Sequence, residues 1–295
     1  MYENRRRRLG DRKDGFRLHK ITPLFRLTPF IMRERDDSLV YYEFDCDITK
    51  AEKAMRALRQ SDYRALSYTH LSMAAIARTM AEYPKMNRFV AGRRVYARKD
   101  MKFSLAAKTS ISGEGKEYLL VTKVEPHDTL TEVARKFDEQ LATVFKENVT
   151  ENGTDKLLNF FGHFPRLLLS FVVWAVRTLD YYGLMPMALA DALPFYSSAF
   201  VTNIGSIGGD SIYHHVYNFG TVSVFLALGG KKTVREVLAD GSVRTSQKIT
   251  FRICADERIC DGYDYVTAMR AFKFYFEHPN ALMKPAEKVL EDPDL

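Results

Sequence analysis

The sequence is poor in cysteine and has no opening segment typical of export. Its 295 residues contain three cysteines, Cys46, Cys254 and Cys260. An odd number without close spacing argues against a disulfide framework and against a zinc site. The first ten residues, MYENRRRRLG, carry charges with no apolar stretch behind them, so no signal peptide is expected. We therefore expect a cytoplasmic protein without a structural metal.

Three further features are missing from the chain. It shows no internal repeat and no flexible linker, which favours one domain. Its longest apolar run, LLLSFVVWAV, lies between Arg166 and Arg177. A membrane-spanning helix needs about 20 apolar residues, so this run is too short to cross a bilayer. No basic stripe with interleaved aromatic residues is present, and nucleic acid is therefore not an expected partner.

The composition is that of a folded domain with a basic balance. Hydrophobic residues make up 46% and charged residues 27%, and the net charge is +7. This is enough apolar material for one large core or two small ones. Part of the positive charge sits in residues 1–20, which we interpret as a basic, partly disordered arm. The alternative is a patch that touches anionic lipid or nucleic acid.

We expect one domain over residues 21–295. Its first half alternates between strand and helix patterns. Residues 39–48 alternate apolar and acidic side chains, which predicts a half-buried strand. Thr49 with Glu52 and Thr129 with Glu132 have the spacing of capping boxes, so a helix is expected after each. Further segments read as a helix that stops at Pro84, a hairpin around Gly92, and two strands, KFSLAAKT and EYLLVTKV.

The second half begins with an unusually apolar insert at about 155–193 and then returns to strands. The insert is expected to form two or three helical pieces. We weigh three roles for it: a cap buried on the sheet or in an oligomer, a lid over a lipophilic acyl chain, or a surface that contacts a membrane together with the arm. After it come the strands SSAFVTNIG and TVSVFLALGG, a hairpin across Asp240-Gly241 into SQKITFRICAD, and a helix over roughly 262–276. The order of elements predicts one α+β domain with a large mixed sheet.

Two motifs near the C-terminus carry a family resemblance. The segment CADERICDGYDYVTAMRAFKFYFEHP resembles the end of the catalytic domain of dihydrolipoyl acyltransferases, the core subunits of 2-oxoacid dehydrogenase complexes, and of chloramphenicol acetyltransferase, which shares their fold. In the family motif His-x-x-x-Asp-Gly, this chain matches Asp261 and Gly262, together with the flanking Asp256 and Arg258, but has Glu257 in place of the histidine. FVTNIGSIGGDS resembles the family segment that precedes this motif, and LSMAAIARTMAEYPKMNRFV resembles a family helix.

The resemblance implies a fold, an assembly and a reaction. The fold is a chloramphenicol acetyltransferase-like two-layer α+β fold that forms a homotrimer. Its active sites lie in channels between subunits, with CoA entering from one side and the acyl acceptor from the other. We therefore expect an acyl-CoA-dependent acyltransferase that acts on a small or lipophilic acceptor. Lipoyl domains precede the catalytic domain in the family, and no covalent lipoyl group is expected on this chain.

The resemblance also assigns candidate residues to the chemistry. Acyl transfer needs a general base near neutral pKa and a donor for the oxyanion. By position, Thr202 is the oxyanion donor, and Asp261 braces the loop by pairing with Arg26 or Arg33. A free glutamate has a pKa of about 4.3, so Glu257 is a weak base unless burial raises its pKa.

An unusual His214-His215 pair follows the Thr202 segment, and one of its rings can face the channel. The base candidates are thus Glu257, His214 and His215. The alternative is a trimeric scaffold or ligand-binding relative that has lost its base.

Overall fold

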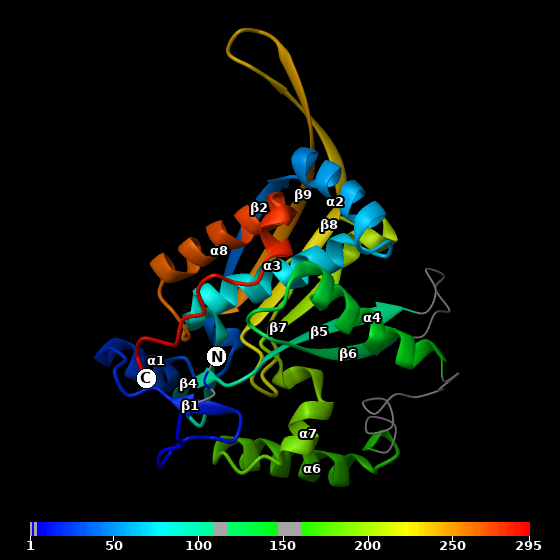
Figure 1. The fold of residues 1–295 in the computed structure, drawn as a ribbon. Helices are drawn as coiled ribbons and strands as arrows, with labels where there is room; N and C mark the ends of the chain where they lie inside the picture. The colour runs from blue at the N-terminus through cyan, green and yellow to red at the C-terminus, as the bar shows by residue number, and fades with distance from the viewer. Residues whose placement is uncertain (1, 3–4, 109–116, 147–160) are drawn as a thin grey trace.

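A six-stranded mixed sheet organises the chain (Figure 1). The computed structural model describes residues 2, 5–108, 117–146 and 161–295. In spatial order the strands are β2 (Leu39–Asp47), β9 (Val243–Asp256), β8 (Val224–Val237), β7 (Ala199–Asn203), β5 (Met101–Lys108) and β6 (Glu117–Val124). β7 runs parallel to both of its neighbours, and the other pairs are antiparallel. The expected α+β class with a large mixed sheet is confirmed.

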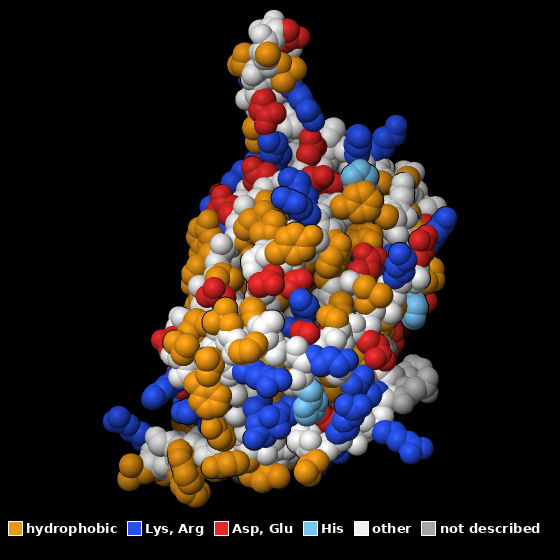
Figure 2. All heavy atoms as spheres, turned by 90° about the vertical axis from the view of Figure 1, so that its left-hand side faces the viewer, with side chains coloured by type: hydrophobic (Ala, Val, Ile, Leu, Met, Phe, Trp, Pro, Cys, Tyr) orange, Lys and Arg blue, Asp and Glu red, His pale blue; other side chains and the backbone are white. Residues whose placement is uncertain are grey.

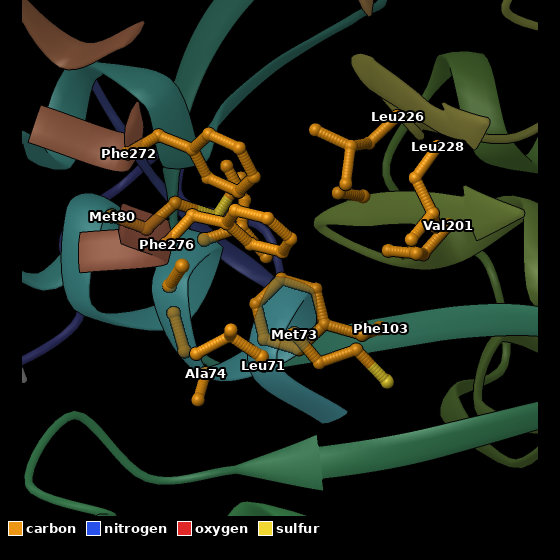
Figure 3. Packing of buried hydrophobic residues seen from close by; sticks show 14 of the residues in the cluster. Leu71, Met73, Ala74, Met80, Phe103, Val201, Leu226, Leu228, Phe272 and Phe276 are labelled. Atoms are coloured by element: carbon orange, nitrogen blue, oxygen red, sulfur yellow. The ribbon is translucent and has the colours of Figure 1, made fainter. Parts of the chain in front are cut away.

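Helices cover one face of this sheet and enclose the main core. They are α2 (Thr49–Ser61), α3 (Tyr68–Glu82), α4 (Leu130–Lys146) and α8 (Gly262–Glu277). Figure 3 shows Phe272 and Phe276 of α8 and Leu71 of α3 meeting side chains that the strands contribute. α3 is buried along most of its length, which fits its run of small and apolar residues. This layer fixes the position of the strands and therefore of every side chain on their other face.

The opposite face of the sheet holds a second, smaller cluster. Phe200, Phe225 and Cys254 project from β7, β8 and β9 and pack with Val216 and Val222. The segment 211–217 crosses this face. Its Ser211 hydroxyl donates to the carbonyl oxygen of Ala227 at 2.9 Å. Period-two alternation along each strand places one set of side chains in the helical core and the other set here.

The N-terminal region forms a small antiparallel sheet beside the large one. β4 (Arg94–Arg98) lies between β1 (Gly15–Arg17) and β3 (Arg88–Ala91), and α1 (Pro23–Ile31) follows β1 in sequence. Within the arm, Tyr2 and Phe16 are buried and pack edge to face at 5.4 Å. The described part of residues 1–20 thus includes a strand and three core side chains, Tyr2, Phe16 and Leu18.

The described part of the insert includes the helices α6 (Arg166–Tyr181) and α7 (Met187–Ala192). None of the α6 side chains is buried, and Trp174 is 61% exposed. The expected cap buried on the sheet is therefore wrong for α6 in one copy of the chain, since this helix lies at the margin of the molecule (Figure 1). Burial in an oligomer remains a prediction. Across the residues described, no helix combines the length and apolarity needed to span a membrane. The first part of the insert, 155–160, falls outside those residues.

A long hairpin projects from the far end of the sheet (Figure 1). The outer ends of β8 and β9 join through a turn at Asp240-Gly241, where Gly241 has a φ of +81°. Val237 and Val243 near this turn are 76% and 60% exposed. The predicted Asp-Gly hairpin is confirmed, and its tip packs on nothing within the described chain.

Local sequence signals agree with the structure except at one helix start. Thr129 and Glu132 form the predicted capping box, with the Glu132 carboxylate accepting from the Thr129 backbone N–H at 2.8 Å. α2 begins at Thr49 as expected, but it has no side-chain cap. Glu52 instead accepts from Lys231 at 2.6 Å, because β8 brings this lysine alongside the helix. A long-range ion pair thus replaces the predicted local box.

Candidate functional site

Thr202 lies near the end of β7, on the sheet face opposite the helical core. It is half-buried, and its neighbour two residues earlier on the same face is Phe200. No partner for its side-chain hydroxyl is found among the described residues. The chain then turns away at Gly205, where a Cβ would lie 2.4 Å from the carbonyl oxygen of Gly229, so only glycine fits. Thr202 therefore presents a free hydroxyl at the point where the strand ends.

His214 lies against the same face. Its ring stacks on Phe225 with centroids 3.8 Å apart, and Phe225 stacks on Phe200 at 5.0 Å. In the parallel β7–β8 register, Thr202 lies opposite Ala227, two positions beyond Phe225. Strand spacing therefore puts the Cα atoms of Thr202 and Phe225 about 8 Å apart. The structure thus brings His214 and Thr202 into the same region of one face.

Hydrogen bonding fixes the tautomer of His214. Its Nδ1 lies 2.8 Å from the carbonyl oxygen of His215. A carbonyl oxygen only accepts, so Nδ1 carries the proton and Nε2 keeps its lone pair. Burial lowers the pKa of His214 below its ordinary value of 6.5. The ring is therefore neutral at pH 7, with an acceptor nitrogen available.

His215 is placed differently. It is exposed, its Nδ1 lies 3.3 Å from the carbonyl oxygen of Val216, and its ring meets Tyr217 edge to face at 5.2 Å. Its ring stacks on that of His214 at 4.9 Å, on the side away from Phe225. Of the two predicted histidines, His214 is the one held against the sheet.

Glu257 lies apart from this region. It is exposed in the turn after β9, and its backbone N–H donates to the carbonyl oxygen of Ser38 at 2.8 Å. Ala227, the partner of Thr202, pairs in turn with Arg252. Glu257 lies five residues beyond Arg252, and Arg252 lies two strands across the sheet from Thr202. The Cα atoms of Glu257 and Thr202 are therefore roughly 19 Å apart. Within one copy, Glu257 and Thr202 cannot act on the same substrate atom.

Asp261 caps a helix. It is exposed, precedes α8, and its carboxylate accepts from the backbone N–H of Asp264 at 2.8 Å. In the described chain it forms no ion pair with Arg26 or Arg33, the two partners expected from the sequence. Asp261 therefore orders the start of α8, while another carboxylate takes the role of binding arginine.

That carboxylate is Asp256, which is fully buried. It accepts two hydrogen bonds from Arg258, at 2.8 Å from Nε and 2.7 Å from Nη2, and one from the Ser38 hydroxyl at 3.0 Å. Arg35 Nε lies 3.9 Å away. Desolvation lowers the pKa of Arg35, and the Asp256 charge opposes that shift. We call Asp256, Arg258 and Arg35 the clamp, because together they tie the turn carrying Glu257 to the chain after α1.

Sequence reasoning found two of the three clamp residues only as letters of the motif. Asp256 and Arg258 matched the family pattern, but no pairing was assigned to them, and Arg35 was not singled out. The available signal was the spacing of an acid and a base two residues apart, Asp256 and Arg258. The described residues contain no group of acidic, histidine or cysteine side chains placed to hold a metal ion.

Comparison with known proteins agrees with this description. Residues 196–284 match the family model of the 2-oxoacid dehydrogenases acyltransferase (catalytic domain). The resemblance to dihydrolipoyl acyltransferases is confirmed over these residues. They include Thr202, His214, His215, Glu257 and Asp261. No curated protein sequence matches the chain.

Solved structures of two dihydrolipoamide acetyltransferases and of a pyruvate dehydrogenase core share the fold. A probable dihydrolipoamide acetyltransferase from Listeria monocytogenes is 14% identical, with a TM-score of 0.55 over 92% of this chain and 96% of that one. The Azotobacter vinelandii enzyme is 14% identical, with a TM-score of 0.51 over 88% of each chain. The cubic core of a pyruvate dehydrogenase multienzyme complex is 14% identical, with a TM-score of 0.51 over 90% of this chain and 93% of that one. The likeness extends to the N-terminal half, beyond the residues that the family model matches.

Proposed function

We propose that this protein is a CoA-dependent acyltransferase that moves an acyl group from a CoA thioester to a small or lipophilic acceptor. The match of residues 196–284 to the acyltransferase catalytic domain supports the reaction class. The observation that carries the proposal is the position of His214, whose neutral imidazole shares one face of the sheet with the unpaired hydroxyl of Thr202.

His214 is the base that the geometry favours. The Nδ1 hydrogen bond to the His215 carbonyl leaves Nε2 as a proton acceptor, and burial keeps the ring neutral at pH 7. A general base with these properties removes the proton from the acceptor's hydroxyl or thiol as the acceptor attacks the thioester carbonyl carbon. Glu257 is exposed, and its carboxylate has no hydrogen-bond partner among the described residues that would prepare it for this task.

Thr202 supplies the second element. Attack on the carbonyl carbon opens the C=O bond and places negative charge on its oxygen, to which the Thr202 hydroxyl donates. When the intermediate collapses, the carbon–sulfur bond breaks and CoA leaves as a thiolate. The protonated His214 returns its proton to that sulfur, so the base is regenerated. Each proton and electron pair is accounted for without a metal or a redox partner.

Glu257 enters the site only if a second copy of the chain brings it there, as in the intersubunit channels that the resemblance implies. In the Azotobacter enzyme, a serine, a histidine and an asparagine were investigated for roles in catalysis. The serine precedes the histidine by 52 positions and the asparagine follows it by four. Here Thr202 precedes Glu257 by 55 positions and Asp261 follows it by four. This correspondence supports the assignment of Thr202, Glu257 and Asp261 to one site, and their separation within one copy is the reason to place Glu257 in that site from a second copy.

The proposal is tested by thioester turnover with detection of the released thiol, over acyl-CoAs of increasing chain length. Thr202→Val keeps the shape of the side chain but removes the donor, and should lower kcat about 10²–10³-fold. Thr202→Ser keeps a hydroxyl and is the matched control, expected to retain most activity. Glu257→Gln should reduce turnover only if a second copy completes the site.

A negative result is equally informative. Wild-type protein that turns over no acyl-CoA above buffer and binds none would favour the alternative of a non-catalytic scaffold or ligand-binding relative. Activity that survives unchanged in Thr202→Val would place the oxyanion donor elsewhere.

A further inference from the structure

A cavity of about 630 Å³ is lined in part by Arg35 and Arg258 of the clamp. Neither Thr202 nor His214 lines it. Its walls come from the end of α6, the β3–β4 turn, the chain after α1 and the turn at Arg258. Cavities of ≈ 300–1,000 Å³ are typical of small-molecule sites. α6 belongs to the apolar insert, so one wall of this cavity is built from the segment that sequence reasoning could not assign.

The cavity is strongly basic. Five arginines line it, against Glu34 and Asp180 as the acidic residues: Arg33, Arg35, Arg93, Arg177 and Arg258. The acids are already engaged, since Glu34 pairs with Arg177 at 3.2 Å and Asp180 with Arg12 at 2.6 Å. Arg258 and Arg35 belong to the clamp with Asp256. Arg33 and Arg93 are left without an acidic partner among the described residues. Figure 2 shows how Lys and Arg side chains gather on the lower half of one face of the molecule.

Two buried polar atoms of residues that line the cavity have no hydrogen-bond partner among the described residues. They are the hydroxyl of Tyr196, a residue only 4% exposed, and Nε of Arg35, which is 6% exposed. Burial and the nearby charge of Asp180 raise the pKa of Tyr196, so its hydroxyl keeps its proton. Leaving a buried polar atom unpaired is costly, so both atoms mark unused hydrogen-bonding capacity behind this wall of the cavity.

An aromatic wall faces these charges. Trp174, Tyr181 and Tyr182 of the α6 end line the cavity. A close contact holds them in place: Gly92 has a φ of +55°, and a Cβ there would lie 2.2 Å from the carbonyl oxygen of Tyr181. Only glycine permits this approach, which sets the aromatic side chains beside Arg93. Exposed aromatic faces next to unpaired guanidinium groups are suited to a ligand with a planar ring and a phosphate.

We propose that this cavity binds a phosphate-bearing ligand with a planar ring, of the mononucleotide class. Arg33 and Arg93 contact the phosphate, and the ring packs on the aromatic wall. The nucleotide half of CoA and a free mononucleotide share this chemistry. The inference does not require acyl transfer, because binding here involves neither Thr202 nor His214.

The test uses the intrinsic fluorescence of the full chain. Trp174 is the single tryptophan of the sequence and lines the cavity, so its emission reports occupancy directly. The wild-type protein is titrated with 3′,5′-ADP, 5′-AMP, CoA, adenosine and pyrophosphate. We expect a saturable change with the three phosphate-bearing nucleotides, much weaker binding of adenosine and of pyrophosphate, and an affinity that falls as salt rises.

Variants identify the contacts. Arg33→Gln and Arg93→Gln should each weaken 3′,5′-ADP about tenfold, the scale of one charge-assisted hydrogen bond. Arg94→Gln is the matched control, since Arg94 is exposed on the same turn and does not line this cavity. The arginines replaced here are exposed or half-buried, so circular dichroism should show unchanged folding.

The outcomes separate the sources of the ligand and the two proposals. Tighter binding of CoA than of 5′-AMP assigns the cavity to the coenzyme, and equal binding assigns it to free nucleotides. Thr202→Val that loses turnover but still binds 3′,5′-ADP shows that the site and the chemistry are separate. The proposal is overturned if no nucleotide changes Trp174 emission at millimolar concentration, if pyrophosphate binds as tightly as 3′,5′-ADP, or if Arg94→Gln weakens binding as much as Arg93→Gln.

Discussion

Replacing Asp256 by asparagine should destabilise the protein more than any other single change near the motif. Asp256 is fully buried and accepts a two-bond pair from Arg258, which is itself 2% exposed. Arg35, 6% exposed, lies 3.9 Å away. Asparagine has nearly the same size but no charge, so Asp256→Asn leaves two guanidinium groups in the interior without a counter-charge.

The size of the effect follows from this burial. Removing one partner of a buried ion pair costs about 3–5 kcal/mol, because the remaining charge stays desolvated. At roughly 2 °C per kcal/mol for a chain of this size, Tm should fall by about 6–10 °C. The assay is thermal unfolding followed by far-UV circular dichroism at fixed protein concentration. Glu257→Gln is the control: it removes a carboxylate one residue away that is exposed, and its effect should lie within about 0.5 kcal/mol.

Two results would refute the reasoning. A Tm for Asp256→Asn within 2 °C of wild type would mean that Arg258 and Arg35 find other partners or reach solvent. An equal loss of stability in Glu257→Gln would mean that the turn, not the buried clamp, is the sensitive element.

Three further predictions concern the assembly, the base and the thiols. Light scattering on a sizing column should give about three times the chain mass of 34.0 kDa, and a stable monomer at micromolar concentration would argue against the intersubunit site. The lowered pKa of His214 predicts a kcat/KM that is flat above pH 7 and falls as the pH drops through a pKa below 6.5, where the ring gains a proton. A fall in kcat/KM centred above pH 7 would exclude His214 as the base. Burial raises the pKa of Cys254 to about 11 and of Cys260 to about 12, and it raises the pKa of Cys46 as well. The native protein should therefore react with a disulfide reagent at pH 8 far more slowly than the unfolded chain. Rapid reaction of any one cysteine in the native protein would show that this cysteine is accessible.

Much of the sheet and its helices is predictable because local patterns and burial agree. β2 alternates as expected, with Cys46 and Ile48 fully buried on the helical side. The Asp-Gly hairpin and the helix that stops before Pro84 follow from turn and proline chemistry that needs no distant contact. The missing cap on α2 shows the limit: Lys231 is 179 residues away from Glu52 in sequence, and no local pattern predicts that the two pair.

The site residues were predictable in type but not in arrangement. The motif placed Thr202, Glu257 and Asp261 together, whereas strand register separates Thr202 from Glu257 by roughly 19 Å in one copy. The histidine pair gave no indication of which ring meets the sheet, because that depends on how 211–217 crosses Phe225. The exposure of α6 was likewise hidden, since an apolar run of helical period reads the same whether its partner lies within the chain or outside it. Contact with a membrane and a cytoplasmic location stay predictions.

The most direct test of the account compares His214→Ala with His215→Ala in the thioester assay. The two histidines are adjacent in sequence, but only His214 packs on Phe225 beside the Thr202 face. Loss of a general base costs about 10²–10⁴-fold in rate, so His214→Ala should lose that factor while His215→Ala stays within about threefold of wild type. An active wild type whose His214→Ala variant is equally active would contradict the proposed base.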